Sequence, residues 1–248
     1  MLLVIYAPIL ILAVYSFTDS GNIGSIHGFS MQNYVTLFTK GELRDMIVGT
    51  VLLALVSSLL ATILGTMGAI GAFYSKKLAK NFINTANQIP VVNADVVTGF
   101  SICVLLIVAF GMNKESYVPL LIGHVVLSAP FVYLSVVPKL KQMDASLYEA
   151  AMDLGASPSM ALRKVVIPQI MPGIVSGFAL AITLSLDDYF IASYTKPATF
   201  NTISTYVVNA TKGSQTEIKT ALWALSTVIF LIVILAVLPL YYIPWNGY

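Results

Sequence analysis

Apolar and charged positions follow one another along this chain in long blocks. Six predominantly apolar stretches contain no Asp, Glu, Lys or Arg, and they cover residues 1–18, 46–75, 96–113, 116–138, 165–186 and 220–248. An α-helix needs about 20 apolar residues to cross a bilayer core, with a range of about 17–25. The blocks therefore predict six membrane-spanning helices, at about 2–18, 48–75, 90–112, 117–138, 168–194 and 221–243.

Helices are the expected secondary structure throughout, because the apolar runs are continuous and lack the alternation of an outer-membrane β-barrel. Lipid offers no hydrogen bonds to the backbone, which helices satisfy internally. The sequence thus predicts an all-α integral membrane protein. In the second run, small residues recur at every fourth position, which favours close contact with another helix. They are Ser57, Ala61, Gly65 and Ala69.

Composition excludes several other classes. Of 248 residues, 58% are hydrophobic and only 10% are charged, whereas soluble domains carry about 25% charged residues. A soluble enzyme is therefore excluded. The net charge of +2 gives no basic surface for nucleic acid. The single cysteine, Cys103, excludes a disulfide framework and a cysteine-based zinc site, and we expect neither a metal nor a cofactor.

The distribution of basic residues predicts the orientation, because cytoplasmic loops carry an excess of Lys and Arg. The loops after the second and fourth predicted helices contain seven, and the loops after the first, third and fifth contain six in a longer total length. This bias places both termini and the loop 139–167 in the cytoplasm.

The loop 139–167 predicts two short helices. Ser146 and Glu149 have the spacing of a capping box, and Gly155 supplies a left-handed residue that ends the first helix. Ser157 and Pro158 suit the first positions of a second helix, which we expect Pro168 to interrupt.

An apolar stripe follows the first of these helices at positions i, i+3, i+4 and i+7. Its members are Leu147, Ala150, Ala151 and Leu154. Two interpretations are open at this point. The stripe packs on the protein's own helix ends, or it is a docking surface for a cytoplasmic partner.

Glu149-Ala150-Ala151, Gly155 and Ile167-Pro168 resemble the EAA loop of ABC importer permeases. The resemblance implies a type I, MetI-like permease fold with a cytoplasmic coupling helix. Glu149, Ala150, Ala151, Gly155 and Pro168 would then couple the chain to an ATPase subunit. The sequence contains no G-x-x-x-x-G-K-[ST] motif, so ATP hydrolysis is expected on a separate ABC ATPase dimer and the chain itself is not expected to be an enzyme.

The resemblance extends over nearly the whole chain, as one permease domain from 1 to 248. Ser16-Phe17-Thr18-Asp19, Gly28-Phe29-Ser30, Gly123-His124 and Ser185-Leu186-Asp187-Asp188 are similar to the second permease of spermidine/putrescine importers. This family implies location in the bacterial cytoplasmic membrane. It also implies a homologous partner permease and an extracytoplasmic polyamine-binding protein.

Three acids fall in or near apolar runs: Asp95, Asp187 and Asp188. An Asp at a helix centre costs about 2.5–3.5 kcal/mol on insertion scales, so such residues face a partner, a cavity or the interface. Asp187 and Asp188 are either an external cation gate or an interfacial helix end. Neighbouring helical residues point about 100° apart, so one of the pair would face the pathway while the other contacts a neighbouring helix.

Asp95 is expected about one and a half turns into the third helix, as a pathway residue or a capping acid. Tyr189 and Tyr194 would add cation–π contacts to an ammonium group, or belong to the interfacial aromatic belt.

The leading hypothesis is one half of the translocation pathway of an ATP-driven polyamine importer. One alternative is the same permease type for another solute, such as iron, thiamine or a phosphonate. Another is an ATP-independent secondary transporter, which would predict inverted repeats and several buried ionisable groups.

Overall fold

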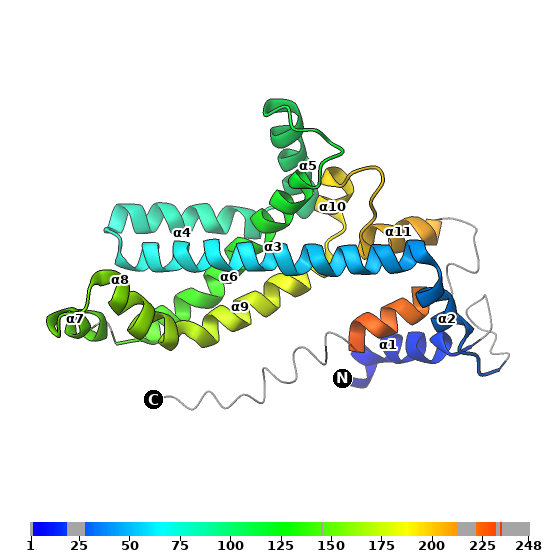
Figure 1. Ribbon diagram of the computed structural model, residues 1–248, viewed down its shortest axis with the longest axis horizontal. Helices are drawn as coiled ribbons and strands as arrows, with labels where there is room; N and C mark the ends of the chain where they lie inside the picture. The colour runs from blue at the N-terminus through cyan, green and yellow to red at the C-terminus, as the bar shows by residue number, and fades with distance from the viewer. Residues whose placement is uncertain (1, 19–27, 145, 213–221, 232–233, 235–248) are drawn as a thin grey trace. The chain divides into compact units, whose positions relative to one another are not determined.

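The computed structural model describes residues 2–18, 28–144, 146–212, 222–231 and 234, and every named element in these ranges is helical (Figure 1). The chain divides into two compact units, which we describe in turn. The first comprises Met1–Thr50 together with Phe200–Tyr248, and the second comprises Val51–Thr199. The long helix α3 (Gly41–Tyr74) begins in the first unit and continues through the second.

The first unit contains α1 (Leu2–Ser16), α2 (Gln32–Thr39), the first turns of α3, α11 (Ile203–Lys212) and an apolar helical segment, Leu222–Leu231. Its core joins Leu43, at the start of α3, to Ile203 and Leu225, which lie far later in the sequence. The Thr50 hydroxyl accepts a hydrogen bond from the Ile203 backbone N–H at 3.1 Å, which fixes the start of α11 against α3.

The second unit contains the remainder of α3 and nine further elements. They are α4 (Lys77–Val92), α5 (Asp95–Cys103), the π-helical η1 (Val104–Ala109), α6 (Val118–Gln142), α7 (Ser146–Asp153), α8 (Pro158–Ala161), the π-helical η2 (Leu162–Val166), α9 (Ile167–Asp187) and α10 (Phe190–Thr195).

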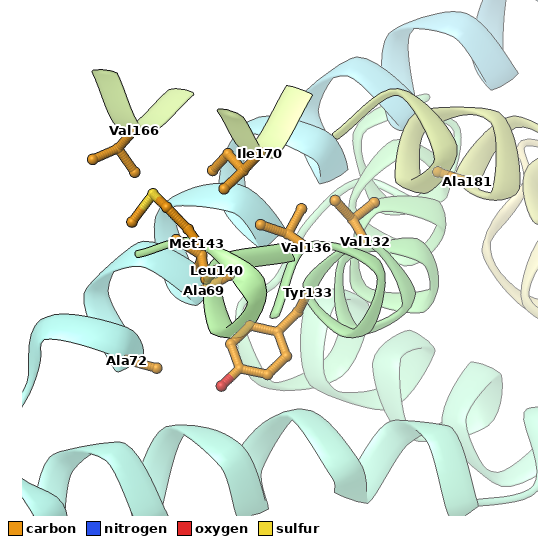
Figure 2. Close-up of a cluster of buried hydrophobic side chains, with 10 residues drawn as sticks. All are labelled: Ala69, Ala72, Val132, Tyr133, Val136, Leu140, Met143, Val166, Ile170 and Ala181. Carbon is orange, nitrogen blue, oxygen red and sulfur yellow. The ribbon is translucent and has the colours of Figure 1, made fainter. Parts of the chain in front are cut away.

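The core of the second unit lies between α3, α6 and α9. Figure 2 shows Val166 and Ile170 facing the side chains of α6, with Ala69 and Ala72 of α3 close by. The predicted small-residue stripe of α3 is buried here, at Ser57, Ala61, Gly65 and Ala69. A methyl group on Gly65 would lie 2.7 Å from the Ala129 carbonyl oxygen. The absence of a side chain therefore permits the close contact between α3 and α6.

The prediction of six membrane spans is not confirmed. Within the described residues, three helices are long and apolar enough to cross a bilayer: Gly41–Tyr74, Val118–Gln142 and Pro158–Asp187. A bent pair, Lys77–Val92 with Asp95–Ala109, makes a fourth if it is counted as one span. The predicted first and sixth spans correspond to shorter apolar helices, Tyr6–Ser16 and Leu222–Leu231. Most of the range 221–243 lies outside the described residues.

The predicted third span, 90–112, was wrong at its start. The chain is already helical from Lys77, and it bends by 107° between Val92 and Asp95. The two lysines at the start of α4 and the polar residues that follow resemble a loop, but they belong to an amphipathic helix. At the bend Ala94 is extended, with ψ 134°, and the Asn93 side chain donates across it to Thr98 Oγ1 at 3.0 Å.

The predicted fifth span, 168–194, differs at both ends. Pro168 does not interrupt the helix, because η2 carries the chain from α8 into α9 without a break. A proline ring clashes with the carbonyl four residues earlier in a regular helix, and the wider π turn that precedes Pro168 relieves this crowding. At the other end α9 stops at Asp187, because Asp188 is extended with ψ 123° and a new helix, α10, begins at Phe190.

Candidate functional site

The break between α9 and α10 separates the two neighbouring acids. Asp187 is the last residue of α9 and its side chain is exposed, whereas Asp188 is buried with a side chain only 4% exposed. The change of backbone direction at Asp188 turns the two carboxylates into different surroundings. Asp187 is therefore the member of the pair that is accessible to a solute.

The Asp188 carboxylate caps the start of α10. Oδ1 accepts from the Ile191 N–H at 3.2 Å, and Oδ2 accepts from the Ala192 N–H at 2.8 Å. The first N–H groups of a helix have no partner inside the helix, and a negative charge is favoured at that end of the helix dipole. Asp188 thus satisfies backbone groups that the break in the helix leaves free.

A chain of buried polar side chains leads from Asp188 back to α3. His124 of α6 is fully buried; its Nδ1 lies 2.9 Å from Ser185 Oγ, and its Nε2 lies 3.8 Å from Asp188 Oδ2. Ser185 Oγ also lies 3.1 Å from Ser57 Oγ. His124 Nε2 has no hydrogen-bond partner among the residues that the structure describes.

One arrangement of protons suits this cluster. If Ser57 donates to Ser185 and Ser185 donates to His124 Nδ1, the imidazole proton is on Nε2 and faces the Asp188 carboxylate. The opposite tautomer would direct a lone pair at a carboxylate oxygen, which is repulsive. The cluster therefore holds α3, α6 and α9 together and orients the break after Asp187.

Asp95 lies near the same break. It is the first residue of α5, exposed, and it follows the 107° bend that ends α4. Asp188 interacts electrostatically with both Asp95 and Asp187. Asp95 was expected one and a half turns into a continuous third helix, whereas it is the first residue of α5, directly after the bend that ends α4.

Two glycines bring the broken helices together. A methyl group on Gly99 of α5 would lie 3.0 Å from Ile191 Cα, and one on Gly123 of α6 would lie 2.6 Å from Ile191 Cγ2. α10 therefore packs directly on the backbones of α5 and α6. Sequence reasoning did not identify Gly99, and it recorded Gly123 only as part of a family resemblance, although isolated glycines in apolar helices are a signal of close contact.

Tyr189 and Tyr194 are both half-buried and make aromatic contacts with their neighbours. The Tyr189 ring lies edge-on to Phe190, with centroids 5.3 Å apart, and the Tyr194 ring lies edge-on to Phe100 at 5.8 Å. The Tyr194 carbonyl accepts from Cys103 Sγ at 3.3 Å. Both tyrosines thus flank the break between α9 and α10, and Tyr194 helps to attach α10 to α5.

The second candidate region is α7 and its surroundings. None of the residues of α7 is buried, and Leu154, just after its end, is 90% exposed. Glu149 and Ala150 are exposed and Ala151 is half-buried. The stripe that contains the two alanines is therefore largely accessible, while Tyr148 anchors the helix through its ring, 4.9 Å from that of Tyr74.

The ends of α7 follow the sequence pattern in part. Gly155 has φ +89°, and the Ala156 N–H donates to the Ala151 carbonyl at 3.0 Å, as in a Schellman motif. The next helix begins as predicted, with the Ser157 hydroxyl accepting from the Met160 N–H. At the first end, however, Ser146 is already helical and donates to Asp144 Oδ1, which also accepts from the Ser146 N–H. Asp144 therefore replaces the predicted capping residue, because its carboxylate reaches two donors.

Pro168 is the second residue of α9, which follows η2 directly. The segment from α7 to α9 thus joins an exposed helix to a long apolar one. Within the described residues no group of three or more His, Cys, Asp or Glu side chains is arranged for a metal ion.

These features are typical of a polytopic helical transport protein. They are apolar helices of membrane-spanning length, a buried polar cluster beside two helix breaks, and an exposed capped helix. Residues 61–243 match the family described as binding-protein-dependent transport system inner membrane component, and the chain belongs to this family. It is therefore the membrane component, or permease, of an ABC importer.

Two relatives from Escherichia coli (strain K12) match most of the chain. The spermidine/putrescine transport system permease protein PotC is 28% identical over 232 residues, which are 94% of this chain and 87% of that protein. The putrescine transport system permease protein PotI is 32% identical over 231 residues, or 91% and 81% of the two chains.

Solved structures support the fold. A bacterial ABC transporter involved in the import of the acidic polysaccharide alginate superimposes with a TM-score of 0.73 at 18% identity, covering 96% of this chain and 90% of that one. A bacterial alginate ABC transporter in complex with alginate pentasaccharide-bound periplasmic protein gives a TM-score of 0.70 at 17% identity, covering 93% and 85%. The chain therefore has the fold of an ABC importer permease.

Proposed function

We propose that this chain forms one half of the translocation pathway of an ATP-driven polyamine importer. The observation that carries the substrate class is the placement of Asp95 and Asp187, which are both exposed and lie at the start of α5 and at the end of α9, where α5 packs on α10. Polyamines are elongated polycations, so separate accessible carboxylates suit them. The names of the relatives, spermidine/putrescine and putrescine permeases, support the same class.

The proposal includes the rest of the assembly. The whole chain acts as one permease domain with six spans, α1 and the region from Leu222 included, and with both termini in the cytoplasm. A homologous permease completes the pathway, and an extracytoplasmic polyamine-binding protein delivers the substrate. ATP is hydrolysed by a separate ATPase dimer, and this chain has no catalytic residue of its own.

Coupling to the ATPase is proposed for the segment from α7 to α9. Ala150 and Ala151 allow close approach of the ATPase surface, Glu149 lies on the exposed side, and Gly155 fixes the end of the helix. Pro168 lies in the first turn of α9. Because α7, α8, η2 and α9 follow one another with short links, a displacement of α7 is transmitted along the chain towards Asp187.

The test is uptake into proteoliposomes. The permease is reconstituted alone, and with its partner permease, ATPase and binding protein, and ATP-driven uptake of radiolabelled spermidine and putrescine is measured. We expect uptake only in the complete assembly. Uptake by the permease alone would contradict the proposal. So would a complete assembly that transports neither spermidine nor putrescine.

The role of the exposed acids is tested in the same assay. Asp187→Asn and Asp95→Asn keep the side-chain size and remove the charge, and Asp45→Asn is the control because Asp45 is exposed in the other unit. Loss of a charge-assisted hydrogen bond costs about 1.5–3 kcal/mol, which is roughly a 10–150-fold weaker apparent affinity. Unchanged concentration dependence in both test variants would exclude them from the pathway.

A further inference from the structure

The second unit contains a small cavity that is separate from the polar cluster around Asp188. Its volume is about 50 Å³, and it lies between α3, α4 and α6. Its polar lining consists of Lys80 and Asn84 of α4 and of Tyr133 and Lys141 of α6, while the ring of Phe73 forms part of the apolar wall. None of these residues belongs to the proposed pathway or to the coupling segment.

The polar groups of the cavity offer hydrogen-bond donors. Each lysine ammonium has three donors and no acceptor. The Tyr133 hydroxyl donates to Asn84 Oδ1, so the acceptor of that amide is occupied and its NH₂ group remains as a donor. Lys80 Nζ lies 5.9 Å from the centre of the Phe73 ring, which holds the ammonium group beside the cavity.

The charge of the two lysines is not neutralised locally. Within the described part of the chain, neither ammonium group has a carboxylate oxygen within 4.0 Å. The nearest acid along the chain after Lys141 is Asp144, whose carboxylate accepts two hydrogen bonds from Ser146. The cavity therefore combines two unpaired positive charges with amide donors, which is the recognition chemistry of a phosphate group.

The cavity lies at the ends of two apolar runs, where a bilayer is expected to meet water. The apolar run of α3 ends at Ser75, and Lys76 and Lys77 follow; on α6, Lys139 and Lys141 follow the last apolar turn. Most of the cavity wall is apolar, with Ala69 and Ala72 from α3 and Val137 and Leu140 from α6. Basic pockets at the end of apolar helices bind lipid head groups.

We propose that this cavity binds the phosphate of an anionic membrane phospholipid, with Lys80 and Lys141 as its charged contacts. A free phosphate ion offers the same oxygens, but the apolar wall of the cavity and its place at the ends of the apolar runs of α3 and α6 favour the lipid. Occupancy by lipid would tie the start of α4 to the end of α6.

The test measures lipid binding to the full chain in its purified transporter complex. The complex is delipidated in detergent and titrated with phosphatidylglycerol, phosphatidylcholine or inorganic phosphate, and bound molecules are counted by native mass spectrometry. We expect tight binding of phosphatidylglycerol, weak binding of phosphatidylcholine, and no displacement of phosphatidylglycerol by millimolar phosphate.

Variants locate the site. Each lysine near a membrane surface contributes roughly fivefold to binding of anionic lipid, so Lys80→Gln with Lys141→Gln should weaken phosphatidylglycerol binding about 30-fold. Lys76→Gln with Lys164→Gln removes the same charge from exposed positions outside the cavity and should retain most of the binding. Lys80→Arg with Lys141→Arg keeps the charge and should also retain it.

Three results would overturn the proposal. The wild type binds phosphatidylglycerol no better than phosphatidylcholine, both double Gln variants lose binding equally, or inorganic phosphate displaces the lipid. The second result would indicate diffuse attraction to the surface, and the third would indicate a site for a free anion. The Arg variant separates loss of charge from misfolding, because it changes the same two side chains and keeps their charge. If the Gln variant misfolds, lipid binding by the Arg variant decides the question.

Discussion

Replacement of Gly65 by alanine tests the close contact between α3 and α6 most directly. The added Cβ would lie 2.7 Å from the Ala129 carbonyl oxygen and 2.8 Å from Val132 Cβ. Both neighbours belong to the backbone or to its first side-chain atom, so no rotation of a side chain can relieve the contact. The helices must move apart, or α3 must bend.

The size of the effect follows from these distances. Ordinary van der Waals contact begins at 3.4 Å, so a contact of 2.7 Å requires a displacement of about 0.7 Å. A gap of about 0.5–1 Å already removes a quarter to a half of the dispersion energy of each contact. Overpacked interiors lose about 1–3 kcal/mol in total.

The matched control is Gly71→Ala, on the same helix. A methyl group there has no neighbour within 4 Å. Glycine to alanine favours a helix by about 1 kcal/mol at either position, so this contribution cancels when the two variants are compared. The difference in free energy of unfolding should be about 1–3 kcal/mol, with Gly65→Ala the less stable variant.

Thermal unfolding of the purified full chain in detergent measures this difference. About 1 kcal/mol corresponds to about 2–4 °C for a chain of this size, so the two melting temperatures should differ by about 2–12 °C. Equal melting temperatures would refute the close packing of α3 on α6 through Gly65.

Four further predictions follow from individual contacts. Asp188→Asn should lower thermal stability and complex yield more than Asp187→Asn, because only Asp188 caps α10 with two hydrogen bonds; equal melting temperatures would contradict this role. Gly155→Val should reduce substrate-stimulated ATP hydrolysis, since φ is +89° and a left-handed residue costs about 1–2 kcal/mol, whereas Gly155→Asn should retain more activity; equal losses would exclude a backbone effect. Ala151→Trp should weaken association with the ATPase in pull-down measurements without altering polyamine affinity. Hydrogen bonds from the Ser146 backbone and hydroxyl lower the pKa of Asp144. The cap of α7 is therefore fully present above the ordinary pKa of about 3.9, and it is lost as the pH falls through the lower pKa of the folded protein. The titration midpoint of this carboxyl group in ¹³C NMR should lie below about 3.9, and Ser146→Ala should raise it.

Charge-free runs predict where the helices lie but not where they break. The run 116–138 coincides with most of α6, and the run 46–75 coincides with most of α3. The bend after Val92 could not be placed, because the lysines and asparagines of α4 have the composition of a loop. In the structure α4 uses those residues on one face, including Lys80 and Asn84, which line the cavity beside α6.

The sequence identified Asp95 and Asp187 as candidate residues, but it did not predict which segments lie beside them. Helical geometry predicted that Asp187 and Asp188 differ in direction. It placed Asp95 inside one continuous third helix, because the bend after Val92 was not expected. The glycine contacts of Gly99 and Gly123 with Ile191 bring α5, α6 and α10 together, and contacts between distant segments are not encoded in local hydrophobicity.

The two helix breaks lie beside each other for a physical reason. Each break frees backbone N–H and C=O groups that a continuous helix would pair. Asp188 accepts from two of these N–H groups at the break after Asp187, whereas at the bend after Val92 the Asn93 side chain donates to the Thr98 hydroxyl. A buried carboxylate is itself costly. If Ser57 and Ser185 donate in series towards His124 Nδ1, the imidazole proton on Nε2 faces Asp188 Oδ2 at 3.8 Å and offsets part of that cost. Asp188 and its partners therefore stabilise the break, while Asp187 and Asp95 remain exposed, as the proposed contact with a cationic substrate requires.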